Sequence, residues 1–591
     1  MSPAAEVEVA PRPLRVRWLG TVRYAEALDL QRALFAQGTT DHLLLLEHPH
    51  VYTLGASADP RHVLVPPAEV GAELARADRG GDVTYHGPGQ LVGYPIISVD
   101  TKRGGGMGDT VAYVHGVEQV LIDALVDLGV VGAARLDRYP GVWLGLDEGR
   151  PRKLAAIGVK LSRGRTMHGF ALNVDPDLTM FGHIVPCGIS DMGVTSLAAE
   201  GVAVTMRQVV DAVATRAALV WGRGAVDRQD VVWRVADDDL SAFSRGLGPG
   251  RPVRPDGHGA GGASAGHGTA TVVSLGPTRR GDLPGAGTSP RLAKRLAQAG
   301  VGGGLGVRDR KPAWLRAPVR HGPEVRHLRS MMRELDLVTV CEEAGCPNLS
   351  DCWADGTATF MINGERCTRA CGFCLVDTRR PDPPDPAEPS RVAESVARLG
   401  LRHAVVTAVA RDDLADGGAA GFVATVHAIR AAVPGCRVEL LIPDCKGEPA
   451  ALDAINEARP DVLNHNLETV PRLQRAVRPS ASYGRSLAVL SRAKAAGLTT
   501  KSGLIVGMGE TEDEVASTLA DLTGVGCDIV TIGQYLRPTT HHLPVERWVP
   551  PERFDWYRQV GVDLGIGHVE ASPLTRSSYH AGQAADALVC S

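Results

Sequence analysis

The sequence has no long apolar run, no secretory leader and no large surplus of charge. We find no run of about 18 apolar residues, so a membrane-spanning helix is not expected. The first twenty residues lack the apolar core of a signal peptide, which predicts a cytoplasmic protein. The net charge of −4 gives no electrostatic reason to expect binding to nucleic acid or to an anionic membrane. What remains is the class of soluble globular proteins.

The chain is too long for one hydrophobic core, and its composition changes sharply near the middle. A protein of 591 residues normally folds as several domains. Residues 246–290 are dominated by Gly, Pro and Ser, a composition that cannot bury enough apolar surface to order a backbone. We predict an N-terminal domain over residues 14–240, a flexible linker over 241–295 and a C-terminal domain over 296–591. Such a tether would leave two independent domains.

Both domains are predicted to belong to the α/β class. The first combines short apolar strands, such as residues 42–49 and 90–99, with helical apolar spacing over residues 109–129 and 205–221. The second alternates apolar strands with amphipathic helices, which predicts βα units and a parallel sheet. Because there are about six such units, we expect a full or partial (β/α)6 barrel with its site at the carboxyl ends of the strands.

Three cysteines of the C-terminal domain have a spacing that favours an iron–sulfur cluster. Cys367, Cys371 and Cys374 form a CxxxCxxC, whereas zinc sites prefer paired CxxC knuckles and four protein ligands. Three thiolates on one loop can hold three irons of a [4Fe–4S] cluster and leave the fourth iron open. This spacing ahead of a βα barrel resembles the radical S-adenosylmethionine superfamily, in which the open iron binds S-adenosylmethionine and one electron cleaves it. Structural zinc is the alternative.

A second triplet, Cys341, Cys346 and Cys352, narrows the resemblance. Together with other segments, this triplet makes nearly the whole C-terminal domain similar to the lipoyl synthase family. The segments that carry the resemblance are CEEAGCPNLSDCW, CTRACGFC, ARDDLADGG, HNLETVPRL, TKSGLIVGMGET and RSSYHA. The resemblance implies an auxiliary [4Fe–4S] cluster on this triplet, with Ser578 of RSSY as the fourth ligand. It also implies that this cluster donates two sulfurs to C6 and C8 of an octanoyl chain. An alkoxide, being harder than a thiolate, should leave readily when a carbon–sulfur bond forms.

Further residues of the C-terminal domain are expected to contact S-adenosylmethionine or substrate. GLIVG looks like the glycine-rich strand on which the superfamily lays the adenine. ARDDLADGG departs from the pattern, because Ala410 stands where many relatives have an acidic or amide residue. The residues expected to bind the cofactor are Asp412, Asn466, Glu468, Gly503 and Gly507.

The N-terminal domain carries one cysteine, Cys187, and a glycine-rich polar loop, RGGDVTYHGPGQ. Glycine lets a backbone approach a ligand and point N–H groups at it. This loop and four other segments resemble the lipoyl(octanoyl) transferase family; the other segments are EHPHVYTLG, KLAAIG, HGFALNV and PCGI. The resemblance implies a mixed α+β fold of the biotin/lipoate ligase-like type. The resemblance implies that Cys187 takes octanoate from acyl carrier protein as a thioester, with Lys153 as the base. The residues expected to line the acyl and oxyanion site are Arg79, Gly80, Gly81, Asp82, Val83, Thr84, Tyr85, His86, Ala156, Ile157, Gly158, Gly169, Phe170 and Ala171.

The two resemblances are to consecutive steps of one pathway. We therefore predict a fused enzyme that transfers octanoyl to a lysine of a lipoyl carrier domain and then inserts two sulfurs. The expected partners are acyl carrier protein, the lipoyl domains of 2-oxoacid dehydrogenases, the glycine cleavage H protein, and an electron donor such as ferredoxin or flavodoxin.

Three alternatives remain open from the sequence. The first domain could be an ATP-dependent lipoate or biotin ligase, which needs no cysteine nucleophile. The second could be another sulfur-inserting radical enzyme, such as a biotin synthase relative. A non-catalytic iron–sulfur or zinc protein joined to an inactive acyl-binding domain is the alternative from outside the enzymes.

Overall fold

The computed structural model of the chain describes most of both halves. The described residues are 13–38, 40–99, 109–186, 192–222, 225–232, 290–302, 304–305, 309–315, 330, 334, 338–339, 348 and 358–589. Cys187 and the triplet Cys341, Cys346 and Cys352 lie outside these ranges, as does the expected linker up to residue 289.

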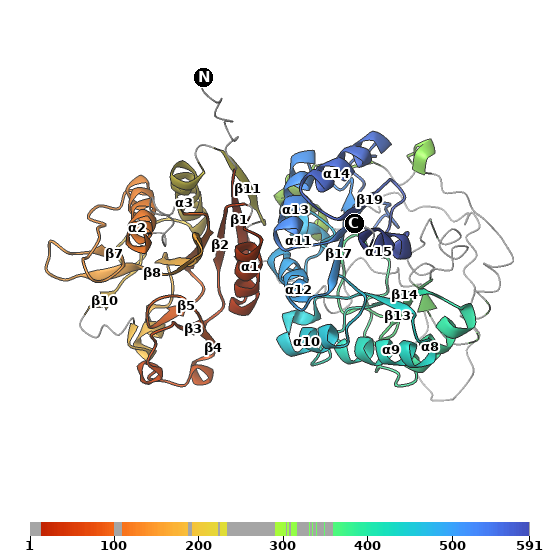
Figure 1. Cartoon of the computed structure of the whole chain (residues 1–591). Coiled ribbons are helices and arrows are strands. Elements are labelled where there is room, and N and C mark those ends of the chain that lie inside the picture. Colours follow the sequence, from red (N-terminus) through yellow and green to blue (C-terminus); the bar gives the residue numbers. More distant parts are fainter. Residues whose placement is uncertain are drawn as a thin grey trace, which may run out of the picture.

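The N-terminal half is built on one mixed sheet (Figure 1). The strand order is β10–β8–β9–β6–β2–β1–β11, and β7 pairs with β8. The strands are β1 (Leu14–Thr21), β2 (His42–Glu47), β6 (Gln90–Ile96), β7 (Gly141–Leu144), β8 (Arg152–Ser162), β9 (Arg165–Asn173), β10 (Gly193–Val194) and β11 (Val226–Asp230).

Helices cover both faces of this sheet because the strands are apolar on both sides. Along β2, Leu43 and Leu45 share a core with α2 (Thr110–Asp127) and α3 (Met206–Trp221). The alternate residues, Leu44 and Leu46, belong to the core that contains α1 (Tyr24–Gln37). This alternation is the period-two geometry of a strand, and it places α1 on the opposite face from α2 and α3.

A small second sheet carries the polar loop of the N-terminal half. Its order is β4–β3–β5, with β3 (Val51–Leu54), β4 (Glu73–Arg76) and β5 (Val83–His86). Residues 79–82 of the loop directly precede β5. The start of RGGDVTYH is therefore irregular backbone, whereas its end is a strand.

The C-terminal half is a parallel sheet whose strands follow chain order from β12 to β19. Strands β13 to β19 pair in parallel, and β12 is antiparallel at one end. The strands are β12 (Val338–Thr339), β13 (Ala358–Ile362), β14 (His403–Ala408), β15 (Arg437–Leu441), β16 (Val462–Asn464), β17 (Thr499–Val506), β18 (Ile529–Gln534) and β19 (His568–Ala571).

Each strand from β13 to β18 is followed by at least one helix. The helices are α8 (Glu388–Leu399), α9 (Ala419–Ala432), α10 (Pro449–Glu457), α11 (Gln474–Val477), α12 (Tyr483–Ala495), α13 (Glu512–Gly524) and α14 (Pro551–Asp563), with α15 (Ala581–Val589) after β19. A further helix, α4 (Pro290–Gln298), precedes this half and contacts α11. The predicted α/β class is confirmed for both halves. None of the described helices has the length and apolar character needed to cross a bilayer.

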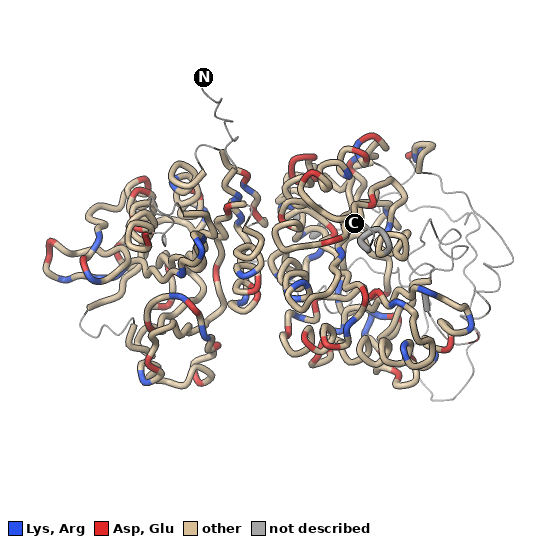
Figure 2. The backbone as a smooth tube through the Cα atoms, in the orientation of Figure 1, with Lys and Arg blue, Asp and Glu red and all other residues tan. Residues whose placement is uncertain are grey.

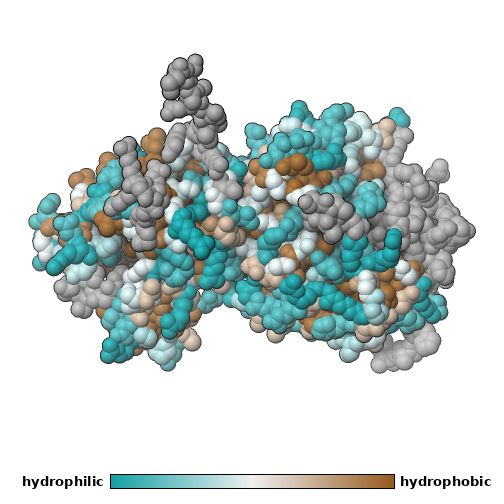
Figure 3. Space-filling view, in the orientation of Figure 1, coloured by the Kyte–Doolittle hydropathy of each residue, from teal (hydrophilic) through white to brown (hydrophobic). Residues whose placement is uncertain are grey.

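The two halves pack against each other, which the composition of the linker does not predict. Helix α1 faces α12 across the junction (Figure 1). Leu19, Val22 and Leu34 of the first half share one apolar core with Tyr483 and Leu487 of the second. In the space-filling view the halves touch across a waist, and hydrophilic residues dominate the visible surface on both sides of it (Figure 3).

Charged residues reinforce this junction, and both signs occur on each side of it (Figure 2). Arg17 of β1 donates through Nε to both carboxylate oxygens of Asp521 in α13, at 2.9 and 2.8 Å. Its Nη2 donates to Ser517 at 2.7 Å and to Asp227 of β11 at 3.0 Å. The expectation of two freely moving domains is therefore not met, because each half presents an apolar face with complementary charges to the other.

Candidate active sites

A pocket in the N-terminal half lies where the polar loop meets β8 and β9. It has an empty volume of about 480 Å³, counting its open mouth. All the residues predicted to line the acyl site except Val83 and Tyr85 lie on its wall, namely Arg79, Gly80, Gly81, Asp82, Thr84, His86, Ala156, Ile157, Gly158, Gly169, Phe170 and Ala171. The structure thus brings together segments that are far apart in the sequence, and their role in binding substrate stays a prediction.

Val83 and Tyr85 do not line the pocket, because they lie on the opposite face of β5. Successive side chains of a strand point to opposite sides. Thr84 and His86 line the pocket, whereas Val83 and Tyr85 are fully buried in a separate apolar cluster with Phe181. The prediction of an unbroken lining over RGGDVTYH is corrected at these two positions.

Arg79 is fixed beside the pocket by hydrogen bonds and by a glycine. Its Nη2 donates to the carbonyl oxygen and to Oγ1 of Thr53, both at 2.8 Å. The side chain runs past Gly158 of β8, where an added Cβ would lie 2.9 Å from Arg79 Cδ. Glycine at 158 therefore keeps room for the arginine beside the pocket.

Three pocket residues were not singled out in the sequence: Tyr24 of α1, Tyr94 of β6 and His168 of β9. His168 adjoins Gly169 in the segment HGFALNV, which is a signal that could have identified it. Its Nε2 lies 2.7 Å from Asp78 Oδ1. Burial alone would raise the pKa of Asp78, but hydrogen bonds from Lys160 and His168 lower it to about 2.

Two buried histidines give the pocket region an uncharged polar wall. Burial lowers the pKa of His48 to about 4 and that of His86, which lines the pocket, to about 3. His48 Nδ1 lies 2.7 Å from the carbonyl oxygen of Val22, so Nδ1 carries the proton. His48 Nε2 therefore accepts a hydrogen bond from Tyr94, at 2.7 Å. Both rings are neutral at physiological pH.

Lys153 lies on β8 and is largely buried. Its Nζ is 4.7 Å from the centre of the Trp143 ring. Strand β10 pairs with Lys153, and the Thr195 amide donates to the Lys153 carbonyl at 3.0 Å. The chain that follows Cys187 thus returns to Lys153, while the pairing of Cys187 with Lys153 stays a prediction.

In the C-terminal half, Cys367, Cys371 and Cys374 lie on the loop after β13 as free, partly exposed thiols. The backbone amides of Arg369 and Ala410 donate to Cys367 Sγ at 3.4 and 3.3 Å. Burial raises the pKa of Cys371 to about 12, and the Cys367 thiol nearby adds to this effect. Metal binding must therefore displace protons from these thiols.

This donor set fits an iron–sulfur cluster. Among the described residues, no three His, Cys, Asp or Glu side chains are gathered around a point where one ion would sit. In a [4Fe–4S] cluster each thiolate binds its own iron, so neighbouring free thiols on one loop suit that group.

The residues predicted to bind the cofactor occupy the carboxyl ends of the parallel strands. After β16, Asn466 Nδ2 donates to Glu468 Oε1 at 3.0 Å and contacts Ser577 Oγ at 2.6 Å. A Cβ at Gly503 of β17 would lie 2.7 Å from Asn466 Oδ1, so glycine leaves space there. The RSSY segment is thereby brought beside these strand ends, and Ser578, the next residue after Ser577, is half-buried.

The remaining two predicted cofactor residues differ in their surroundings. Gly507 directly follows β17 with a φ of 100°, and a Cβ there would lie 2.1 Å from Gln534 Nε2. Asp412, in contrast, accepts two hydrogen bonds of 2.7 Å from Arg369. It therefore anchors the cysteine loop.

Comparisons with known proteins match both halves. Residues 23–218 match the family Lipoyl protein ligase A/B catalytic domain, and residues 361–522 match the Radical SAM superfamily. The lipoyl synthase of Rubrobacter xylanophilus is 56% identical over 276 residues, 46% of this chain and 86% of the relative. That of Kineococcus radiotolerans is 54% identical over 275 residues, covering 46% and 83%. That of Mycobacterium leprae is 55% identical over 293 residues, covering 50% and 91%.

The lipoyl synthases show the class of the C-terminal half, and the family model over residues 23–218 gives that of the N-terminal half. Radical chemistry with S-adenosylmethionine and [4Fe–4S] clusters follows from the family, and two clusters are typical of lipoyl synthase. Lipoyl carrier proteins are the substrates that both activities share. The chain belongs to the lipoyl synthase family through its C-terminal half and, with a lipoyl protein ligase A/B catalytic domain in its N-terminal half, is a bifunctional protein lipoylation enzyme.

Proposed function

We propose that the N-terminal half, residues 14–240, is an octanoyltransferase that works through a thioester on Cys187. The second half, residues 296–591, then converts the octanoyl group on the carrier lysine to lipoyl. The observation that carries the proposal is the pocket formed by the loop of residues 79–82 with β8 and β9. Its apolar side chains, Ile157 and Phe170, suit a hydrocarbon chain.

The transfer needs two exchanges at sulfur. In the first, Cys187 Sγ attacks the thioester carbon of octanoyl-acyl carrier protein, Lys153 takes the thiol proton, and the carrier thiol leaves with a proton. In the second, the ε-amine of a lipoyl-domain lysine attacks the octanoyl-Cys187 carbon, an amide forms, and the Cys187 thiol is regenerated. Backbone N–H groups of the glycine-rich loop are suited to stabilise the oxyanion of each step.

An ATP-dependent ligase is the competing function for this half. A ligase activates a free acid as an adenylate and needs no cysteine. The test is intact-protein mass spectrometry after incubation with octanoyl-acyl carrier protein alone. We expect an octanoyl adduct that forms without ATP and is absent from Cys187→Ala. An adduct in that variant, or transfer only from free octanoate with ATP, would refute the proposal.

In the second half, the chain supplies ligands and a shaped site. We propose that Cys367, Cys371 and Cys374 hold the cluster that binds S-adenosylmethionine, and that Asn466 and Glu468 contact this cofactor. When bound, the two clusters supply the electron that cleaves S-adenosylmethionine and the sulfur that is inserted.

The auxiliary site and the partners complete the proposal. Cys341, Cys346 and Cys352 with Ser578 would hold the auxiliary cluster, while Gly503 and Gly507 leave room for the adenine. Acyl carrier protein is the proposed octanoyl donor, and a ferredoxin or flavodoxin is the proposed electron donor. Free thiols at every described cysteine agree with the reducing conditions of a cytoplasm.

A further inference from the structure

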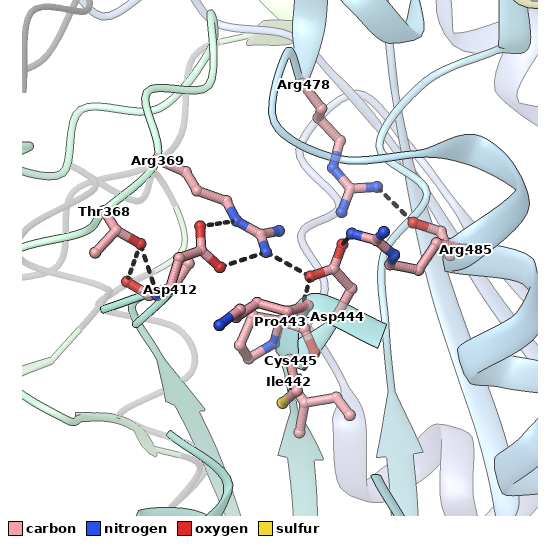
Figure 4. Close-up of polar contacts among 12 residues, drawn as sticks. Thr368, Arg369, Asp412, Ile442, Pro443, Asp444, Cys445, Arg478 and Arg485 are labelled. Carbon is pink, nitrogen blue, oxygen red and sulfur yellow. Dashed lines mark hydrogen bonds and ion pairs between the residues drawn. The ribbon is translucent and has the colours of Figure 1, made fainter. Parts of the chain in front are cut away.

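A row of alternating charges begins at the loop that carries the three cysteines. Arg369 lies between Cys367 and Cys371 and is nearly buried. Its Nε and Nη2 donate to the two carboxylate oxygens of Asp412, both at 2.7 Å. Nη2 also donates to Asp444 Oδ1 at 2.6 Å. Figure 4 shows Arg369 between these two carboxylates, so the loop is held from both sides.

Asp444, after β15, is the deepest member of this row. Its side chain is 0% exposed. Burial alone would raise the pKa of its carboxyl, but Arg369, with help from Arg485, holds that pKa well below its ordinary value. The second oxygen, Oδ2, makes no hydrogen bond and lies 3.6 Å from Arg485 Nη1. Asp444 is thus bonded to one arginine and only approached by the other.

The position of Arg485 is set from the N-terminal half. Arg485 lies on α12, and its Nε donates to Oε1 of Glu26 in α1 at 2.6 Å. The side chain of Glu26 is 6% exposed, and its other oxygen accepts from the Arg23 amide at the start of α1. Gly447 packs against the pair, since a Cβ there would lie 2.3 Å from Glu26 Oε1. Glu26 therefore has little freedom to move.

We propose that Glu26 of the N-terminal half is a positioning residue for the radical chemistry of the C-terminal half. By holding Arg485 3.6 Å from Asp444 Oδ2, it leaves Asp444 free to bind Arg369 and so fixes the CTRACGFC loop. Without the Glu26 charge, Arg485 is free to bind Asp444 Oδ2, which makes no hydrogen bond, and this second ion pair draws the carboxylate away from Arg369. This inference rests on the membership of the C-terminal half in the lipoyl synthase family and is independent of the octanoyltransferase proposal.

The same interface offers a matched control. Asp29 lies one turn further along α1 and pairs with Arg492 of α12 at 3.1 Å. Arg492 continues to Asp453 at 2.8 Å, a half-exposed residue of α10. Asp29→Asn therefore removes one interface charge from the same two helices without touching Asp444.

The test compares full-length Glu26→Gln and Asp29→Asn. Hydrogen–deuterium exchange of residues 363–378 is measured on the metal-free chain. The KM for S-adenosylmethionine and the electron paramagnetic resonance signal of the reduced cluster are measured after reconstitution. For Glu26→Gln we expect the exchange rate of residues 363–378 and the KM for S-adenosylmethionine each to rise by about threefold or more. The paramagnetic resonance signal of the reduced cluster should also change. Asp29→Asn should match the natural protein in all three.

A double variant separates a relay from a general loosening of the interface. If Glu26 acts through Arg485, then Glu26→Gln/Arg485→Gln should be no worse than Arg485→Gln alone. Additive losses, equal effects of Glu26→Gln and Asp29→Asn, or an unchanged loop in Glu26→Gln would each overturn the proposal. Because the exchange measurement needs neither cluster nor acyl donor, its result does not depend on either activity.

Discussion

The buried polar groups that stand out at the two sites differ in charge. Around the N-terminal pocket, burial keeps His48 and His86 neutral, with pKa values of about 4 and 3. At the strand ends of the C-terminal half, Arg369 and Asp444 stay charged because each is bonded to the other. The acyl site that we propose in the first half would need a wall that accepts a hydrocarbon chain, whereas the proposed cluster site in the second would need a cysteine loop held rigidly in place.

The difference follows from what each kind of burial costs. A neutral imidazole with both nitrogens hydrogen-bonded carries little penalty in an apolar site. A buried ion pair repays its desolvation only while both partners are present, so the loss of one partner is costly. We therefore expect the first site to be sensitive to the volume of the side chains around its pocket, and the second to the loss of single charges. Both should respond to acid, because His465, directly after β16, is buried with a pKa lowered to about 4.

Filling the N-terminal pocket should have the largest effect on activity. Gly158→Val would place atoms against Arg79 Cδ, which already lies 2.9 Å from an added Cβ. We expect octanoyl transfer to fall by about 100-fold or more, because small displacements at an active site have such effects. Sulfur insertion into a carrier that already bears octanoyl should be unchanged.

The control for this variant is Gly116→Ala on α2, where an added Cβ meets nothing within 4 Å. Both rates are measured on the full chain with purified substrates. Normal octanoyl transfer by Gly158→Val would show that the acyl group binds elsewhere.

Removing one charge from the C-terminal site should have the largest effect on stability. Arg369→Met leaves Asp444 buried without its hydrogen-bonded partner, a change that costs about 3–5 kcal/mol. The measurement is urea unfolding of the metal-free chain. Arg366→Met is the control, because Arg366 is on the same loop but pairs at the surface with Asp382, where about 1 kcal/mol or less is expected. Equal stability of both variants would contradict the comparison.

The sequence predicts the parts of this account that depend on local spacing. The CxxxCxxC motif identifies the cysteine loop, and the glycine-rich loop RGGDVTYH identifies most of one pocket wall. The prediction from the sequence is wrong at Val83 and Tyr85, because only the position of β5 in its sheet shows which of its side chains point away from the pocket. It also misses Tyr24, because that residue reaches the pocket from α1 through tertiary packing.

Long-range pairs are beyond any local pattern. Arg17 and Asp521 are separated by 504 positions, and Glu26 and Arg485 by 459. Separations of this size have no helical or strand period, so neither pair can be recognised from local spacing. The packed junction therefore could be found only from the structure.

Mild acid should destabilise the protein through its buried histidines, which lie in both halves: burial lowers the pKa of His48 in the first half and of His465 in the second to about 4. A buried histidine with a lowered pKa is neutral when folded, so unfolding takes up a proton below its unfolded pKa of about 6.5. Stability is therefore full above about pH 6.5 and falls as the pH drops toward the folded value of about 4 for His48. The loss reaches roughly 3 kcal/mol at pH 4. The contribution of Asp444 to stability is lost only at more acidic pH, below the ordinary pKa of an aspartate, because its folded-state pKa is lowered.

Unfolding curves between pH 7 and pH 4 check this expectation. His48→Gln should reduce the loss of unfolding free energy between pH 7 and pH 4. His115→Gln, on an exposed part of α2, should leave that loss unchanged. An identical pH dependence in His48→Gln and the natural protein would show that His48 is not the group that titrates.

The smallest effect is expected at a partly exposed interface pair. Asp29→Asn removes the contact with Arg492, and pairs of this kind contribute about 0–1 kcal/mol. Thermal unfolding should shift little, and the effect should shrink further as salt is added. A loss comparable with that of Arg369→Met would mean that the junction depends strongly on such partly exposed pairs.

The most direct test of the central claim is mass spectrometry of a lipoyl carrier domain. The full chain with both clusters is incubated with that domain, octanoyl-acyl carrier protein, S-adenosylmethionine and a reductant, without ATP. The account predicts octanoyl on the carrier lysine first and lipoyl on the same lysine later, with no lipoyl when S-adenosylmethionine is omitted. A carrier that stays unmodified without ATP, or one that gains octanoyl but never sulfur, would contradict it.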